Sequence, residues 1–134
     1  MKPFLDTNVL VYAVLSDDPR CRTAERLLAA GGTISVQVLN EIANVARRKM
    51  RLSWPETQSF VSAIRGLLTV QPLTVETHED GLRIAERYGL SIYDAMIVAA
   101  ASRASCDTLW SEDMQHGMVF SGPMRIVNPF RERT

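Results

Sequence analysis

The sequence has few cysteines, no excess of either charge and no long hydrophobic run. Its two cysteines, Cys21 and Cys106, match no metal-binding spacing and are too few for the disulfide framework of a small secreted protein. Fifteen basic residues balance fifteen acidic ones, so the net charge does not steer the chain towards nucleic acid. No apolar stretch approaches the roughly 20 residues of a membrane helix, and no signal-peptide pattern opens the chain. These absences predict a cytoplasmic protein with reduced thiols and no membrane partner.

The length and composition are those of an ordinary folded domain. The chain has 134 residues, of which 46% are hydrophobic and 22% are charged, far from the compositions of disordered or fibrous proteins. Domains of this size bury a substantial core. Residues 1–134 are therefore expected to form a single domain, and composition alone excludes no class of substrate.

Hydrophobic periodicity predicts strands and helices in alternation. Short strands are expected over residues 2–6, 33–36, 70–75, 108–111 and 125–127. Helices are expected over residues 9–15, 24–30, 37–50, 55–68, 77–89 and 92–105. Pro72 favours an edge position for the third strand, because proline cannot donate a backbone hydrogen bond. Alternation of this kind predicts an α/β sandwich in which helices cover both faces of a parallel sheet.

Two acidic residues follow predicted strands directly. Asp6 ends the first strand, and Asp113 lies just beyond the strand over residues 108–111. In parallel sheets the functional crevice lies outside the carboxyl ends of the strands. The topology alone therefore predicts that these two carboxylates meet at one edge.

Four acidic residues, taken singly, each have a structural explanation beside a functional one. Asp6 fits a turn aspartate that bonds its own backbone, and Asp113 fits an ordinary acidic loop. Glu41 lies on a polar stripe of its helix, which is usually a solvated face. Asp94 follows Ser91 by three residues, as in a variant capping box. The functional interpretation depends on the four acids occurring together.

A cluster of carboxylates is itself a chemical signal. Neighbouring negative charges raise one another's pKa unless a cation neutralises them. Oxygen ligands without histidine or cysteine suit Mg²⁺ or Mn²⁺ better than zinc. Such ions hold phosphodiesters and lower the pKa of bound water. The cluster therefore predicts hydrolysis of phosphodiester bonds.

Four motifs around these acids occur in order along the chain. They are Phe-Leu-Asp-Thr-Asn-Val-Leu with Asp6 and Asn8, Ile-Ser-Val followed by Glu41, Leu-Ser-Ile-Tyr-Asp-Ala with Asp94, and Leu-Trp-Ser-Glu-Asp-Met with Ser111 and Asp113. Together they resemble the motifs of the PIN-domain ribonucleases, and among these the VapC-type toxins of bacterial toxin-antitoxin systems. The resemblance spans almost the whole chain, and the ordered set is far more specific than any single motif.

The resemblance implies a PIN-like α/β/α sandwich and a Mg²⁺- or Mn²⁺-dependent endoribonuclease that cleaves RNA. It also implies a homodimer that a cognate antitoxin protein holds inactive. By this resemblance Asp6, Asp94 and Asp113 carry the metal, and Glu41 ligates it or activates water. The supporting residues that orient the carboxylates are Asn8 and Ser111.

Two other functions fit part of the pattern. A phosphatase of the phosphoaspartyl type also begins with an aspartate after its first strand, but it needs a second aspartate where this chain has Asn8. It also needs a suitably placed lysine, and the only lysines are Lys2 and Lys49. A non-catalytic Mg²⁺-binding module, either a phospho-receiver or an RNA-binding domain, is the other alternative. The lack of a lysine near the carboxyl end counts against a receiver.

A basic segment and an apolar residue follow the second motif. Arg47, Arg48, Lys49 and Arg51 are placed to contact RNA phosphates, although a charged helix end is more often simply solvated. Trp54 is the apolar residue most strongly expected to be exposed. The helix over residues 55–68 and the one before it carry enough apolar surface for a dimer or antitoxin face, although core packing explains the same residues.

Overall fold

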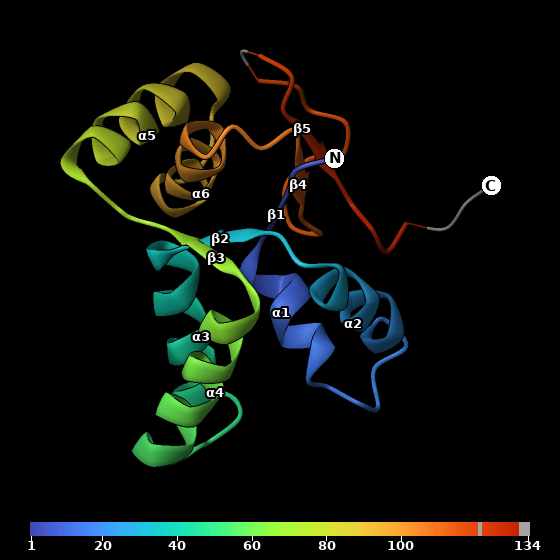
Figure 1. Cartoon of the computed structure of the whole chain (residues 1–134). Coiled ribbons are helices and arrows are strands. Elements are labelled where there is room, and N and C mark those ends of the chain that lie inside the picture. Colours follow the sequence, from blue (N-terminus) through green and yellow to red (C-terminus); the bar gives the residue numbers. More distant parts are fainter. Residues whose placement is uncertain (121, 132–134) are drawn as a thin grey trace.

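Five short strands form one parallel sheet in the computed structural model, which describes residues 1–120 and 122–131 (Figure 1). They are β1 (Pro3–Leu5), β2 (Thr33–Ser35), β3 (Thr69–Gln71), β4 (Thr108–Trp110) and β5 (Arg125–Val127). Their order is β3-β2-β1-β4-β5, and every neighbouring pair is parallel. The predicted α/β class and the edge position of the third strand are confirmed.

Six helices accompany the sheet within the described residues. They are α1 (Thr7–Ala13), α2 (Cys21–Ala30), α3 (Val36–Arg48), α4 (Trp54–Leu67), α5 (Val75–Tyr88) and α6 (Ile92–Arg103). Figure 1 shows α3 and α4 as a hairpin that projects from the sheet at lower left, with α1 and α2 at lower right and α5 beside α6 above. The hairpin and α1 thus lie on the side towards which β1 points.

The observed elements differ from the predicted ones mainly at their ends. The third strand is β3 and stops at Gln71, so Pro72 follows it instead of interrupting it. Helix α5 begins at Val75, two residues earlier than expected, because the Thr74 hydroxyl accepts a hydrogen bond of 3.2 Å from the backbone N–H of Thr77. Hydrophobic periodicity does not detect this cap, because threonine is also common in strands, and the predicted strand over residues 70–75 therefore includes Thr74.

Helices α1 and α3 begin at the residue after a strand or one beyond it, so their first turns lie at the carboxyl edge of the sheet. Asp6 separates β1 from α1 and caps α1. Ser35 ends β2 and caps α3, with its hydroxyl accepting from Val38 N–H at 3.3 Å. Side chains such as these satisfy the free N–H groups of a first turn. At most one residue separates each strand from its helix, so the pairing of β1 with β2 places the first turns of α1 and α3 beside one another.

Helix α6 is buried along most of its length. Residues 95–101 are all buried, as the run of alanines predicted. Small side chains let a helix approach its neighbours closely, and Gly81 of α5 lies against Met96, where an added Cβ would stand 2.7 Å from the methionine sulfur. This packing fixes α6 firmly, and with it Asp94 in the first turn. None of the helices in the described ranges combines the length and hydrophobicity that a membrane span requires.

Candidate acidic site

Asp6 is the most deeply buried carboxylate of the predicted set, with 3% of its surface exposed. Its Oδ1 accepts a hydrogen bond of 2.7 Å from the backbone N–H of Thr7. Its Oδ2 accepts one of 2.7 Å from the Ser111 hydroxyl and a longer one of 3.4 Å from the side-chain amide of Asn8. The turn-aspartate explanation accounts for only one of these oxygens. The other oxygen, Oδ2, accepts hydrogen bonds from Asn8 and from Ser111, which lies 105 positions away in sequence.

Asn8 joins the first and fourth motifs. Its Nδ2 donates to Oδ2 of Asp113 at 3.0 Å and also reaches Asp6, while its Oδ1 accepts from the backbone N–H of Glu112 at 3.2 Å. The parallel pairing of β1 with β4 brings these segments together. One amide therefore spaces two carboxylates 107 positions apart in sequence (113 − 6), as the topology predicted for this edge.

Glu41 is held by both of its oxygens. Thr7 Oγ1 donates to Oε1 at 2.8 Å, and Gln37 Nε2 donates to Oε2 at 2.9 Å. The side chain is half-buried and does not extend into solvent as a surface glutamate would. The polar face of α3 at this position is thus turned towards the first turn of α1 at the sheet edge.

Asp94 lies in the first turn of α6, where Ser91 is the N-cap. The Ser91 hydroxyl accepts from the backbone N–H of Asp94 at 3.2 Å, but the Asp94 carboxylate makes no return bond to the backbone of Ser91. A true capping box, with both bonds, is present at Ser53 and Glu56 of α4. The Asp94 carboxylate therefore does not complete a capping box, although it interacts with the Ser91 hydroxyl, which lowers its pKa.

Burial and mutual repulsion shift two of these acids in the same direction. Burial raises the pKa of Asp6 from 3.8 to about 7, against the lowering effect of its hydrogen bonds, and the charges of Glu41 and Asp94 raise it further. Burial also raises the pKa of Asp94, against the lowering effect of a hydrogen bond with Ser91, and repulsion from Glu41 and Asp113 raises it further. These couplings link all four acids electrostatically, which is the behaviour expected of a carboxylate cluster.

The acids open into a cleft of about 520 Å³ between α1 and α3, called the acidic cleft below. Its lining consists of Asp6, Thr7, Asn8, Val11, Tyr12, Leu15, Glu41, Asn44, Val45, Lys49 and Asp113. Ser111 is fully buried behind Asp6, and Asp94 does not line this cleft although its charge acts on Asp6. Three of the four predicted acids thus share one cleft, and Asp94 approaches them from α6.

The donor chemistry of this cluster fits a divalent cation. In the described part of the chain, no arginine, lysine or histidine forms an ion pair with Asp6, Glu41, Asp94 or Asp113. A buried carboxylate without a counter-charge is costly, and a bound cation removes that cost. Over the same residues, however, no three acidic, histidine or cysteine side chains stand close enough to ligate one ion together. The arrangement suits a divalent cation that is held through one or two carboxylates and keeps several of its waters.

A second cluster supports the fourth motif and was not predicted. Arg20 donates to both oxygens of Glu112 at 3.0 and 3.1 Å and to both oxygens of Asp18 at 2.9 and 2.8 Å. Its guanidinium lies 3.9 Å from the ring centroid of Tyr12, whose hydroxyl donates to Glu112 at 2.6 Å. The cluster ties the residue before Asp113 to α1 and to the loop that precedes α2. In the sequence Glu112 could be recognised only as a second acidic residue beside Asp113, and its contacts with Arg20 and Tyr12 could not be predicted.

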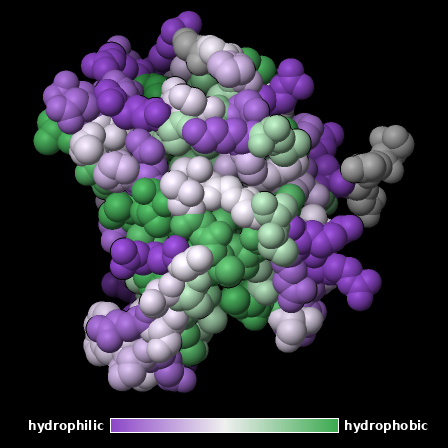
Figure 2. Space-filling model, viewed as in Figure 1, coloured by the Kyte–Doolittle hydropathy of each residue, from purple (hydrophilic) through white to green (hydrophobic). Residues whose placement is uncertain are grey.

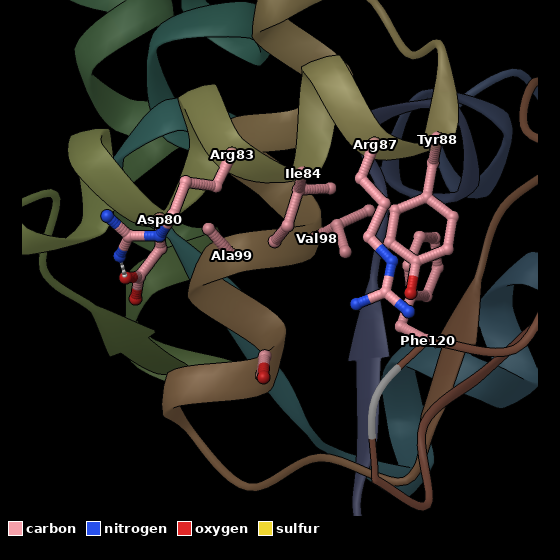
Figure 3. Close-up of a pocket in the computed structure, with 9 residues that line it drawn as sticks. Asp80, Arg83, Ile84, Arg87, Tyr88, Val98, Ala99 and Phe120 are labelled. Carbon is pink, nitrogen blue, oxygen red and sulfur yellow. Dashed lines mark hydrogen bonds and ion pairs between the residues drawn. The ribbon is translucent and has the colours of Figure 1, made fainter.

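Another cleft lies between α5 and α6, and its chemistry is different (Figure 3). Figure 3 shows Arg83 directed towards Asp80 at one end and Arg87 beside Tyr88 and Phe120 at the other. Asp80 is paired with both Arg83 and Arg103, the latter at 2.6 Å. These ion pairs neutralise the only carboxylate in the cleft. It therefore lacks the uncompensated negative charge of the acidic cleft.

Comparison with known proteins relates the chain to one family. The sequence model of the PIN domain matches residues 4–117, a range that includes all four acidic motifs. A comparison with curated protein sequences finds no match.

Solved structures with the same fold include several toxin-antitoxin proteins. The Mycobacterium tuberculosis toxin VapC20, described as cleaving the sarcin-ricin loop, has a TM-score of 0.68 and 23% identity over 84% of this chain and 92% of its own. A toxin-antitoxin complex from Klebsiella pneumoniae has a TM-score of 0.72 and 21% identity, over 98% of this chain and 100% of its own. DNA-bound VapBC from Salmonella typhimurium has a TM-score of 0.64 and 20% identity, over 94% of this chain and 96% of its own. At these identities the likeness establishes the fold.

Proposed function

Because the chain belongs to the PIN-domain family, we propose that it is a divalent-metal-dependent endoribonuclease that hydrolyses RNA phosphodiester bonds. One observation carries the proposal: Asp6 and Asp113 are joined through Asn8 at the carboxyl edge of the sheet, and among the described residues no basic side chain forms an ion pair with either of them. Such a carboxylate pair repels a phosphodiester on its own and attracts one when a divalent ion is present.

We assign the following roles to the predicted residues. Asp6, Asp94 and Asp113 hold Mg²⁺ or Mn²⁺, and Glu41 ligates the ion or orients the attacking water. When bound, the ion supplies charge neutralisation of the phosphate and a lower pKa for water. The two supporting residues keep the carboxylates in position, Ser111 by donating to Asp6 and Asn8 by bridging Asp6 to Asp113.

We further propose that the chain is the toxin of a VapBC-type pair and acts in the cytoplasm as a homodimer controlled by an antitoxin. The toxin-antitoxin complexes among the similar structures support this. A surface suited to an antitoxin is also present, because Val11, Leu15 and Val45 line the acidic cleft beside the acids. Figure 2 shows hydrophobic residues gathered between the α3–α4 hairpin and the α1–α2 side of the molecule. An apolar antitoxin segment placed there would cover the acids.

The phosphatase alternative gains no support from the site. Asn8 occupies the position of the second aspartate, and its amide is already bonded to Asp113 and to the backbone of Glu112. Lys49 lines the acidic cleft, but it follows α3 and not a strand, so it does not occupy the site of a phosphate-binding lysine at the sheet edge.

The decisive experiment compares Asp94→Asn and Asp6→Asn with the wild type in an RNA cleavage assay with Mg²⁺ or Mn²⁺. Both variants are expected to lose metal-dependent cleavage while keeping the far-ultraviolet circular dichroism of the wild type. Glu86→Gln, an exposed change on α5, is the matched control and is expected to cleave normally. Undiminished cleavage by both aspartate variants would refute the mechanism. Release of phosphate from monoesters with RNA left intact would favour the phosphatase instead.

A further inference from the structure

Two aromatic side chains stand in solvent near opposite ends of the outer face of α3. Tyr93, the residue before Asp94, is 67% exposed, and Trp54, the first residue of α4, is 61% exposed. Large aromatic residues usually bury most of their surface, so an exposed pair beside one helix needs a reason. The acidic cleft uses neither of them.

The two rings belong to one continuous surface. Tyr93 borders a hollow whose other lining residues are Gln37, Asn40, Glu41 and Asn44. Trp54 borders a second hollow whose other lining residues are Ala43, Asn44, Arg47 and Arg48. Asn44 lines both hollows and the acidic cleft as well. The surface therefore runs from Tyr93 past the acids to Trp54 without interruption by another element.

Positive charge accumulates at the Trp54 end. Arg48, Lys49 and Arg51 are exposed, and within the described residues none of them forms an ion pair. Lys49 also lines the acidic cleft. In a chain whose acidic and basic residues balance overall, this is a local concentration of unpaired positive charge beside a carboxylate cluster. A polyanion is the complementary ligand.

Arg47 holds the Trp54 ring in place. Its guanidinium lies 4.2 Å from the ring centroid, and its Nη1 donates to the backbone carbonyl of Leu52 at 2.7 Å. A cation stacked on an indole fixes the orientation of the ring. The tryptophan is thus exposed and also oriented by its neighbours, which lowers the entropy cost of stacking a ligand on it.

We propose that this surface, called the aromatic track and consisting of Tyr93, Asn44, Arg48, Lys49 and Trp54, binds single-stranded RNA and leads it past the acidic cleft. Bases stack on Tyr93 and Trp54, and phosphates contact Arg48 and Lys49. The inference rests on the proposed nuclease function, since it supplies the substrate class and the path to the same carboxylates.

The arrangement favours a single strand over a duplex or a protein. Bases reach an aromatic ring face only when they are unstacked, as in single-stranded RNA. From Glu41 to Arg48 the helix rises by about 10 Å, which exceeds the size of one base and suits a short oligonucleotide. Protein interfaces are depleted of lysine and glutamate, whereas Lys49 and Glu41 both lie along this surface.

The test measures binding without cleavage. A fluorescent single-stranded oligoribonucleotide of about 12 nucleotides is titrated with protein in EDTA, and its anisotropy is recorded. Trp54→Leu and Tyr93→Leu are each expected to weaken binding about 5- to 100-fold, the range for loss of one stacked base. Trp54→Phe and Tyr93→Phe are expected to restore most of it. Val75→Ala, equally exposed but on α5, is the control and is expected to bind as the wild type does.

Several results would overturn the inference. These are wild-type affinity in both leucine variants, no binding by the wild type, or an equal loss of affinity for a duplex of the same sequence. Loss of antitoxin binding in Trp54→Leu with RNA affinity unchanged would assign the track to a protein partner instead.

Cleavage assays separate this inference from the nuclease proposal. Cleavage by the wild type and by both leucine variants at equal rates and affinities would refute the track alone. Binding that depends on Trp54, without any metal-dependent cleavage, would refute the nuclease alone.

Discussion

The Ser111 hydroxyl donates a hydrogen bond of 2.7 Å to Oδ2 of Asp6, across 105 positions of sequence. It is the shortest of the contacts that Asp6 makes with another side chain, and both partners are buried. A hydroxyl in this position stabilises the charged form of the carboxylate and lowers its pKa. Ser111 therefore opposes the burial that raises the pKa of Asp6.

Ser111→Ala is expected to destabilise the protein and weaken its affinity for Mn²⁺. A buried acceptor that loses its donor costs about 1–3 kcal/mol of unfolding free energy. The loss should be larger at about pH 8, where Asp6 is charged, than at about pH 5, where it is protonated. Urea unfolding at the two pH values and a Mn²⁺ titration check this. Ser111→Thr keeps the hydroxyl and serves as the control; equal loss in both variants would contradict the explanation.

Asp6 predicts a particular dependence of stability on pH in the absence of metal. Its pKa is raised from 3.8 to about 7 in the folded protein, so the folded state binds a proton that the unfolded state has released. The stabilising contribution is complete below about pH 4 and is lost as the pH rises towards 7. The slope attributable to Asp6 approaches about 1.4 kcal/mol per pH unit.

Asp6→Asn removes this titration. The difference in unfolding free energy between the wild type and the variant, measured in EDTA, should therefore move in favour of the variant as the pH rises from about 4 to about 7. Denaturation with urea at several pH values measures it. A constant difference across this range would show that Asp6 does not titrate there.

Divalent metal is expected to stabilise the folded protein by neutralising the charged carboxylate cluster. Addition of Mn²⁺ or Mg²⁺ at neutral pH should raise the midpoint of thermal unfolding in proportion to the logarithm of metal concentration, because only the folded state gathers the carboxylates. Asp113→Asn and Asp94→Asn should reduce the increase, and Glu86→Gln should leave it unchanged. An increase of the same size in all variants would place metal binding elsewhere.

The Arg20 cluster is expected to act on catalysis by positioning Asp113. Arg20→Gln loses the paired hydrogen bonds to Glu112 and the stacking on Tyr12. Small displacements of catalytic groups reduce rates by up to about 100-fold, so RNA cleavage should slow with little change in RNA affinity. Arg20→Lys keeps the charge but not the forked geometry, and should restore only part of the rate. Full activity in Arg20→Gln would show that the loop is held without it.

The sequence predicted the parts of the site that follow from topology. Asp6 follows β1 directly and Asp113 lies three residues beyond β4, and parallel strands bring their carboxyl ends to one edge, so the meeting of the two acids could be foreseen. The inward orientation of Glu41 could not be foreseen, because a polar stripe on a helix looks the same whether it faces water or another helix. Thr7 and Gln37, which hold Glu41, become visible only once α1 and α3 are placed side by side.

Contacts between distant loops were equally hidden. Arg20 and Glu112 are separated by 92 positions, and neither lies in a motif that specifies the other. The same limit applies to the ends of β3 and α5, where one proline and one threonine decide the boundary. Local pattern thus predicts which elements exist, whereas side-chain partners across the molecule depend on packing that no local window contains.

The central position of β1 has a consequence for synthesis of the protein. Strand β1 pairs on one side with β2, which follows it closely in sequence, but on the other side with β4, whose paired residue Thr108 lies 105 positions after Pro3. A nascent chain therefore carries Asp6 and Asn8 for about a hundred residues of synthesis before their partners Ser111 and Asp113 are made. The proposed nuclease site is therefore complete only once residues 108–113 have left the ribosome, and products truncated before them are expected to lack activity on RNA.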